Sequence, residues 1–234
     1  MDFSTLIGAF SKSLLLVVAA ILPIVNPPAM APTFLAMTEG ASQATRSALA
    51  LRIGRNVALT LIAAMLVGSY VLDFFGISLP IVRVAGGMIV ASSAWKLLSA
   101  SATSADARSE LAETFTAEHV RATAYYPMTF PITFGPGSLA ASITIGAALH
   151  DPHVTLSLAR FAGGMVGAAV VGLAVYLTYR FARKMLQPLG ETGTVVFLRL
   201  SAFILVCVGV QIVWDGASEL ARQVLQEAAA QGNR

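Results

Sequence analysis

Six long apolar segments, separated by shorter polar ones, constrain this chain more than any other feature of its sequence. The hydrocarbon core of a bilayer is about 30 Å thick, and a helix needs about 20 residues to cross it. The segments that meet this length are 13–37, 53–72, 79–98, 122–149, 154–179 and 195–214. Only 12% of the residues are charged, against roughly 25% in soluble domains. The pattern predicts an all-α membrane protein with six transmembrane helices and little soluble mass.

The first and fourth segments are each interrupted by residues that break helices. The first contains Asn26, Pro27 and Pro28 in sequence, and the fourth contains "PITFGPGS", residues 131–138. Proline removes a backbone N–H and clashes with the preceding turn, and glycine weakens a helix. Broken backbone at membrane depth is tolerated only where it is buried in protein or lines a cavity. We therefore expect two half-helices in each segment, with Asn26 and Ser138 as N-caps of the second ones.

The two breaks occupy matching places in two halves of the chain. Residues 1–98 hold three segments and residues 122–234 hold three more, and we expect the polar stretch 99–121 between them to be a cytoplasmic linker. Three crossings per half are an odd number, so the second half must enter the membrane inverted. Interrupted segments at corresponding positions of such repeats point to the solute site of a transporter. The sequence thus predicts two inverted three-helix repeats, with the first helix of each broken at mid-membrane.

The N-terminus of a half-helix exposes unpaired N–H groups and about half a positive charge, which suits a carboxylate. The ammonium group of the same solute would face unwound carbonyls and the amide oxygen of Asn26. A zwitterion would then need no acidic side chain. A proline kink without a binding role is the alternative for either break. The predicted substrate-binding residues are Asn26, Pro27, Pro28, Thr133, Gly135, Pro136, Gly137 and Ser138.

Three polar residues of the third and sixth segments are candidates for a gate or a counter-charge. Arg83 and Arg199 lie near the starts of these segments, and Gln211 lies within the sixth. An arginine at a span end can instead extend to the membrane surface, and a glutamine can hydrogen-bond between helices. All twelve carboxylates lie in loops, tails or segment ends, so we expect none at mid-depth.

Positive charge is distributed unevenly between the two sides of the predicted bundle. Of the 15 lysines and arginines, ten lie nearest the connections between segments 1 and 2, 3 and 4, and 5 and 6, and five lie nearest the other side. Cytoplasmic loops carry the excess of positive charge. Both termini are therefore predicted on the extracytoplasmic side.

Several other function classes find no support in the sequence. A net charge of +3, spread over apolar spans, forms no basic patch, so we expect no nucleic-acid partner. The chain has no nucleophile–base–acid set, nucleotide-binding loop or metal-ligand cluster, so we expect no enzyme activity, cofactor or metal. The expected partners are the lipid bilayer and a small zwitterionic solute. Small residues at four-residue spacing in 163–172 predict close helix packing, within the chain or in a homo-oligomer.

Four motifs, in order and across nearly the whole chain, resemble the MarC family of bacterial and archaeal membrane proteins. They are "LPIVNPPAMAP", "FGISLPIVRVAGGMIVA", "FPITFGPGSLA" and "RLSAFILVCVGVQIVWDG". The family pattern often has Gly where this chain has Pro28, a departure that could stiffen the first break. The resemblance implies six spans in the bacterial inner membrane, a grouping with LysE-type exporters, and transport of small neutral amino acids, as described for some archaeal relatives. The alternative is a non-transporting scaffold or stress-associated membrane protein.

Overall fold

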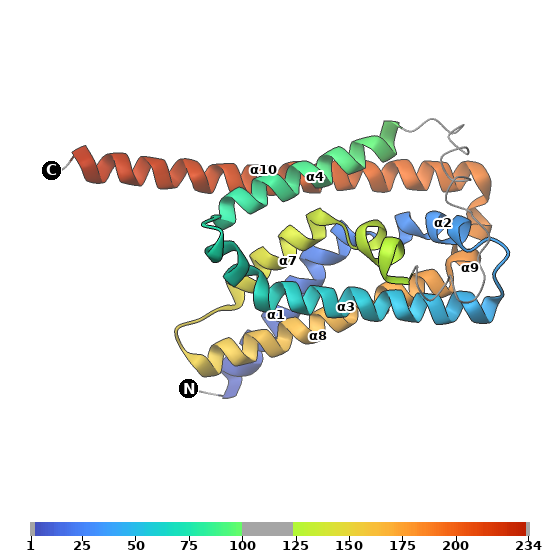
Figure 1. The fold of residues 1–234 in the computed structure, drawn as a ribbon, viewed down its shortest axis with the longest axis horizontal. Coiled ribbons are helices and arrows are strands. Elements are labelled where there is room, and N and C mark those ends of the chain that lie inside the picture. The colour runs from blue at the N-terminus through green and yellow to red at the C-terminus, as the bar shows by residue number, and fades with distance from the viewer. Residues whose placement is uncertain (1–2, 100–123, 233–234) are drawn as a thin grey trace.

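Long helices form an elongated bundle in which both chain termini lie toward the same end (Figure 1). The computed structural model describes residues 3–99 and 124–232, so the predicted linker 99–121 lies almost entirely outside the described residues. No strand occurs within the described residues, and the predicted all-α fold is confirmed. The helices are α1 (Phe3–Val25), α2 (Pro27–Met37), α3 (Gln43–Phe74), α4 (Leu79–Ser99), η1 (Ala124–Thr133), α7 (Pro136–Leu149), α8 (Val154–Arg180), α9 (Ala182–Leu186), η2 (Gln187–Leu189) and α10 (Gly190–Gly232).

Five of these helices are long and apolar enough to cross a membrane, namely α1, α3, α4, α8 and α10. The shorter helices η1 and α7 meet the same criterion only as a pair, and they are bent by 76° at the break between them. Counting this bent pair as one span gives six candidate spans, the number predicted from the apolar segments.

Several helices extend beyond the apolar segments that predicted them. The first begins at Phe3 rather than at residue 13, and α3 begins at Gln43 rather than at residue 53. The last helix has 43 residues, or about 65 Å at 1.5 Å per residue, more than twice the thickness of a hydrocarbon core. The apolar residues identify only the part of a helix that can lie in the membrane. Where the helix begins and ends depends instead on capping residues and on residues that break helices. At α3 the cap is Ser42, whose side chain accepts a hydrogen bond from the Thr45 backbone N–H.

Helix pairing brings the two halves of the chain together. Helix α8 packs along both α1 and α3, α4 packs along α10, and α7 lies against α3 and α4. The main core lies where α1, α3 and α8 meet, and its fully buried side chains include Val17, Ile21, Leu61 and Val171. Many large apolar side chains are exposed on the surface of the bundle, as expected for helices that face lipid.

Glycines of α8 allow two of these helix pairs to touch backbone to backbone. A Cβ atom added at Gly163 would lie 2.2 Å from the Phe10 carbonyl oxygen of α1. On the α3 side, a Cβ added at Gly172 would lie 2.5 Å from the Gly54 carbonyl oxygen. The close packing predicted for 163–172 is therefore confirmed, and its partners lie within the same chain.

The fourth apolar segment is irregular before it breaks. Tyr126 and Phe130 in η1 have extended backbone angles, because each precedes a proline, which disfavours the helical conformation of the residue before it. Threonine hydroxyls bind carbonyls in this segment: Thr129 donates to the Ala124 oxygen and Thr133 to the Met128 oxygen. Side chains of the same segment thus supply hydrogen bonds to some of the carbonyl groups in its broken backbone.

The first break lies at Asn26, between α1 and α2. Asn26 has φ 43° and ψ 61°, a left-handed conformation that asparagine tolerates better than most residues. Because α1 alone has 23 residues, this break falls after a helix that is already long enough to cross a membrane. The first break is therefore observed, but not in the middle of its helical segment.

Candidate functional site

The second half-helix of the bent pair starts with proline, not with a side-chain cap. Gly135 is the N-cap of α7 in extended conformation, Pro136 occupies the first turn, and no side chain caps the helix. Ser138 was predicted as the cap, and this prediction is wrong. It lies inside the first turn and is buried, and its carbonyl oxygen accepts a hydrogen bond from the Ser142 hydroxyl at 2.6 Å. Proline suits the first turn because the N–H it lacks would have no partner there.

The first half-helix end is built in the same way. Asn26 is the N-cap of α2 and Pro27 follows in the first turn, but the Asn26 side chain makes no capping bond. Its carbonyl oxygen accepts from the backbone N–H groups of Ala29 and Met30 at 3.1 and 3.3 Å. The predicted N-cap position is therefore correct, and the predicted side-chain cap is absent.

A cavity of about 320 Å³ opens between α1, α4, α7 and α10. Its walls are mainly small or apolar, including Ala19 and Pro23 of α1 and Ala140 of α7. Gly137, in the first turn of α7, also lines it. A Cβ atom added at Gly137 would lie 2.1 Å from Cγ2 of Val90 in α4. The start of the half-helix thus reaches both the cavity and α4 because this residue has no side chain.

Polar groups from α4 and α10 meet on one side of this cavity. Arg83, Gln211 and Asp215 all line it. The Gln211 amide nitrogen donates to Asp215 Oδ1 at 2.8 Å, which orients the carboxylate. Arg83 forms an ion pair with Glu219, one turn further along α10. The positive charge of Arg83 is therefore matched by Glu219, and no basic side chain pairs with Asp215 within the described residues.

One hydroxyl in the cavity wall has no partner. Thr144 of α7 lines the cavity, and among the described residues its Oγ1 is the buried side-chain polar atom without a hydrogen bond. A buried polar group without a partner costs about 1–3 kcal/mol. Its place in this wall makes it a ready partner for a polar ligand or a water.

The structure brings three of the predicted site residues together and leaves the others apart. Arg83, Gln211 and Gly137 line the cavity. Arg199 is exposed on α10 and is not part of the lining. The predicted site residues that do not line this cavity are Asn26, Pro27, Pro28, Thr133, Gly135, Pro136, Ser138 and Arg199.

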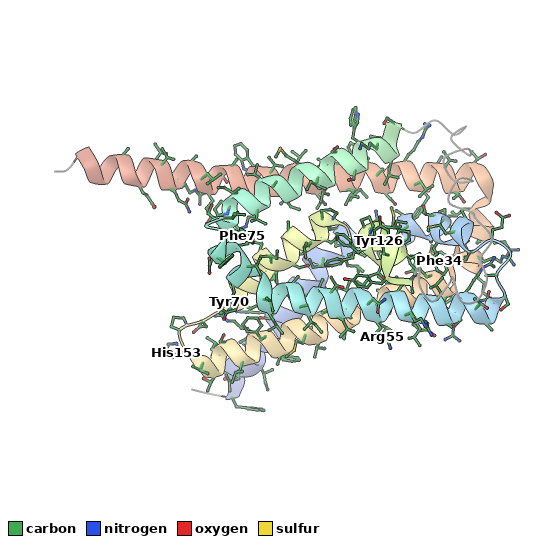
Figure 2. All side chains as sticks on the ribbon, in the orientation of Figure 1. Phe34, Arg55, Tyr70, Phe75, Tyr126 and His153 are labelled. Atoms are coloured by element: carbon green, nitrogen blue, oxygen red, sulfur yellow. The ribbon has the colours of Figure 1, made fainter. Side chains whose placement is uncertain are left out.

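Thr133 belongs to a different, closed part of the bundle. Its hydroxyl lies 2.8 Å from the Tyr179 hydroxyl of α8, and both residues are buried. The Tyr179 ring stacks on Phe34 of α2 with ring centroids 4.5 Å apart. Phe34 lies toward the end of the bundle opposite the termini, whereas Tyr70 and His153 lie toward the end that holds them (Figure 2). Thr133, Tyr179 and Phe34 therefore fill the interior of the bundle at the end opposite the termini, and they do not line the cavity.

Sequence reasoning missed Asp215 and Thr144. Asp215 directly follows the last apolar segment, so the sequence places it among the carboxylates of loops, tails and segment ends, although α10 continues through it. The spacing of Gln211, Asp215 and Glu219 was the available signal, because residues four apart share one helix face. Nothing local distinguishes Thr144 from the other small polar residues of α7. No group of three or more potential metal ligands occurs in the part of the chain that the structure describes.

Long apolar helices and a bent span, with a cavity between them that holds a few polar groups, define a multi-pass integral membrane protein. The chain belongs to the MarC family: its residues 11–221 match the family described as MarC family integral membrane protein. The resemblance seen in the sequence motifs is thereby confirmed.

Relatives from archaea and bacteria share most of the chain's length. A UPF0056 membrane protein of Archaeoglobus fulgidus is 29% identical over 84% of this chain and 88% of its own length. The UPF0056 inner membrane protein MarC of an Escherichia coli strain is 27% identical over 89% of this chain and 96% of its own length. The UPF0056 membrane protein YhcE of Escherichia coli K12 is 27% identical over 82% of this chain and 86% of its own length. No solved structure matches the chain.

Proposed function

We propose that this protein is a transporter of small polar solutes in the inner membrane, with neutral amino acids as the favoured class. The observation that carries the proposal is the cavity between α1, α4, α7 and α10, which is lined both by Gly137 of the bent span and by polar side chains of α4 and α10. Its volume of about 320 Å³ lies at the lower end of the range for ligand pockets, about 300–1,000 Å³. A small solute fits this space. The Escherichia coli relative is named as an inner membrane protein, which supports this location.

The cavity offers one partner for each charge of a zwitterion. The Asp215 carboxylate, held by Gln211, is the partner for an ammonium group. The backbone N–H of Gly137 lies in the first turn of α7, where N–H groups have no partner within the helix and favour an anion. Asn26 was expected to receive the ammonium group, but it does not line the cavity. We therefore assign that role to Asp215.

Helix pairing supports two inverted repeats. If α1–α2, α3 and α4 correspond to η1–α7, α8 and α10, a two-fold axis would pair α3 with α8 and α4 with α10. The same axis would exchange the contact of α1 with α8 for that of η1 with α3, and the contact of α2 with α8 for that of α7 with α3. All six contacts are present. Both half-helices also begin with proline, Pro27 and Pro136, as an equivalent break would require.

Flux measurements in proteoliposomes test the proposed transport. We expect uptake or efflux of a small neutral amino acid by vesicles that contain the protein. Glycine should compete with that flux, whereas glycinamide, which lacks the carboxylate, and glycolate, which lacks the ammonium group, should compete at least about tenfold less well. This follows from the loss of one charged hydrogen bond of about 1.5–3 kcal/mol.

A matched pair of variants assigns the ammonium site. Asp215→Asn should weaken glycine competition at least tenfold, whereas Glu39→Gln, at an exposed carboxylate in the α2–α3 turn, should leave it unchanged. Equal competition by glycolate and glycine would contradict the role of Asp215. Absence of flux for every amino acid in a broad panel would contradict transport of this class and favour a scaffold role.

A further inference from the structure

A second cavity, of about 580 Å³, opens at the end of the bundle that holds the N-terminus. Figure 1 shows the beginnings of α1 and α8 together at this end. The cavity lies between the first turns of these helices and the last turn of α7, and it is separate from the cavity proposed for transport, since the two share no lining residue.

Small residues keep this cavity open. Gly163 brings α8 against the Phe10 backbone of α1, which fixes how close the two helices are. Two residues before Phe10 on α1, Gly8 lines the cavity, and a Cβ atom added there would meet no atom within 4 Å. The space beside Gly8 is therefore not filled by a neighbouring side chain.

The polar lining of this cavity consists of cations and hydroxyls. Lys12 of α1 and Arg160 of α8 line it together with Ser4, Thr5 and Ser13. Ser13 is only 5% exposed, and its hydroxyl makes no hydrogen bond within the described residues. Lys12 likewise has no ion pair there. Two cations and three hydroxyls therefore line one cavity, and these groups are hydrogen-bond donors that suit an anion.

Among the described residues, the acidic and titratable neighbours of Lys12 and Arg160 leave one positive charge unmatched. Arg160 Nη2 lies 2.9 Å from Asp151 Oδ2 in the loop between α7 and α8. The same carboxylate accepts a hydrogen bond from the His153 backbone N–H at 2.9 Å, and the exposed His153 ring lies 3.3 Å from it. Asp151 therefore balances Arg160, and the charge of Lys12 is left without a counter-ion among the described residues.

We infer that this cavity binds a phosphate group, carried by a phospholipid headgroup or free in solution. Phosphate oxygens accept charge-assisted hydrogen bonds from lysine and arginine, and hydroxyls complete such a shell. Leu16, Leu149 and Leu156 also line the cavity, and these aliphatic side chains suit the glycerol and first acyl carbons of a phospholipid.

The test uses the full chain purified in a neutral detergent, with three added probes. They are phosphatidylglycerol, diacylglycerol with the same acyl chains but no phosphate, and inorganic phosphate. Bound lipid is counted by native mass spectrometry, and stability is followed by thermal unfolding. We expect phosphatidylglycerol or inorganic phosphate to bind and raise the unfolding temperature, whereas diacylglycerol does neither.

Matched variants assign the binding to this cavity. Lys12→Gln and Ser13→Ala should each weaken binding of the active probe, the former about tenfold, while Lys96→Gln, an exposed lysine in the last turn of α4, should not. Binding of the lipid alone identifies a headgroup site, and binding of inorganic phosphate alone identifies a free anion site; both support the proposal. Equal binding of diacylglycerol and phosphatidylglycerol, or wild-type affinity in both cavity variants, would overturn it.

Discussion

At the scale of single residues, Gly137 is the position where the bent span, the packing of α4 and the cavity between α1, α4, α7 and α10 meet. A side chain there would collide with Val90, since the Cβ atom alone would come within 2.1 Å of its Cγ2. Gly137→Leu should therefore reduce solute flux at least tenfold, because the added bulk must either fill the cavity or push α7 away from α4. The measurement is initial flux in proteoliposomes, normalised to inserted protein.

Gly8→Ala is the matched control for this substitution. A Cβ atom at Gly8 meets nothing within 4 Å, so flux should stay at the wild-type rate. If Gly137→Leu is correctly inserted and transports normally, the contact at Gly137 has no role in transport, and the bend of this span is only structural.

The amino-acid sequence predicted a site residue correctly where that residue affects only the backbone of its own turn. Gly137 was predicted from the break itself, since proline and glycine act on the turn that contains them. Arg83 and Gln211 were predicted from their polarity within apolar segments. Asp215 and Thr144 were not, because their roles depend on residues that pack against them from other helices.

At the scale of helices, the turn between α2 and α3 is held by a buried arginine. Arg46 of α3 is 9% exposed, and its Nε and Nη2 donate to the Thr38 carbonyl oxygen at 3.1 and 2.9 Å. Thr38 is the C-cap of α2, where carbonyls lack helix partners and a positive charge is favourable. Arg46→Met should lower the free energy of unfolding by about 2–3 kcal/mol, the scale of hydrogen bonds to charged groups.

Arg55→Met on the same helix is the control for Arg46→Met. Arg55 is exposed and lies on the outer side of α3 (Figure 2), so its loss should change stability by less than about 0.5 kcal/mol. Unfolding titrations in mixed micelles compare the two variants. Equal losses of unfolding free energy in the two variants would mean that the hydrogen bonds from Arg46 to the Thr38 carbonyl oxygen do not stabilise the fold.

The loop between α7 and α8 should respond to acid. The His153 backbone N–H, which donates to Asp151 Oδ1 at 2.9 Å, is the main cause that lowers the pKa of Asp151 below its usual 3.8, and Arg160 adds to it. A lowered pKa stabilises the fold above the usual value, and the stabilisation is lost as the pH falls from about 3.8 through the lowered pKa.

We therefore expect this loop to be protected at pH 7 and to open below about pH 3.8. Hydrogen exchange of the His153 amide reports the opening. In Asp151→Asn the amide should exchange faster at pH 7 and lose its dependence on pH in this window, after correction for intrinsic exchange. Unchanged protection in that variant would show that the carboxylate does not hold the loop.

At the scale of the whole molecule, six spans, with the bent pair counted as one, would place both termini on one side of the membrane. Figure 1 shows them at the same end of the bundle, and from the ten-to-five distribution of the 15 lysines and arginines we expect that end to lie outside the cytoplasm. A reporter that fluoresces only in the cytoplasm, fused after Arg234, should stay dark, whereas a periplasmic phosphatase at the same position should be active. A bright fluorescent fusion would reverse the orientation.

The sequence by itself determined the membrane class, the six apolar segments, the places of both breaks and the glycine stripe of α8. These features depend on residue composition along one helix, and hydropathy, proline and glycine act there without help from distant residues. Tertiary structure alone decided which polar groups share a cavity. Arg83 meets Glu219, 136 residues away, only because α4 packs along α10, and Asp215 enters the same cavity only because α10 continues past its apolar segment. Such contacts depend on how helices pair in three dimensions, and no local pattern in either helix specifies that pairing.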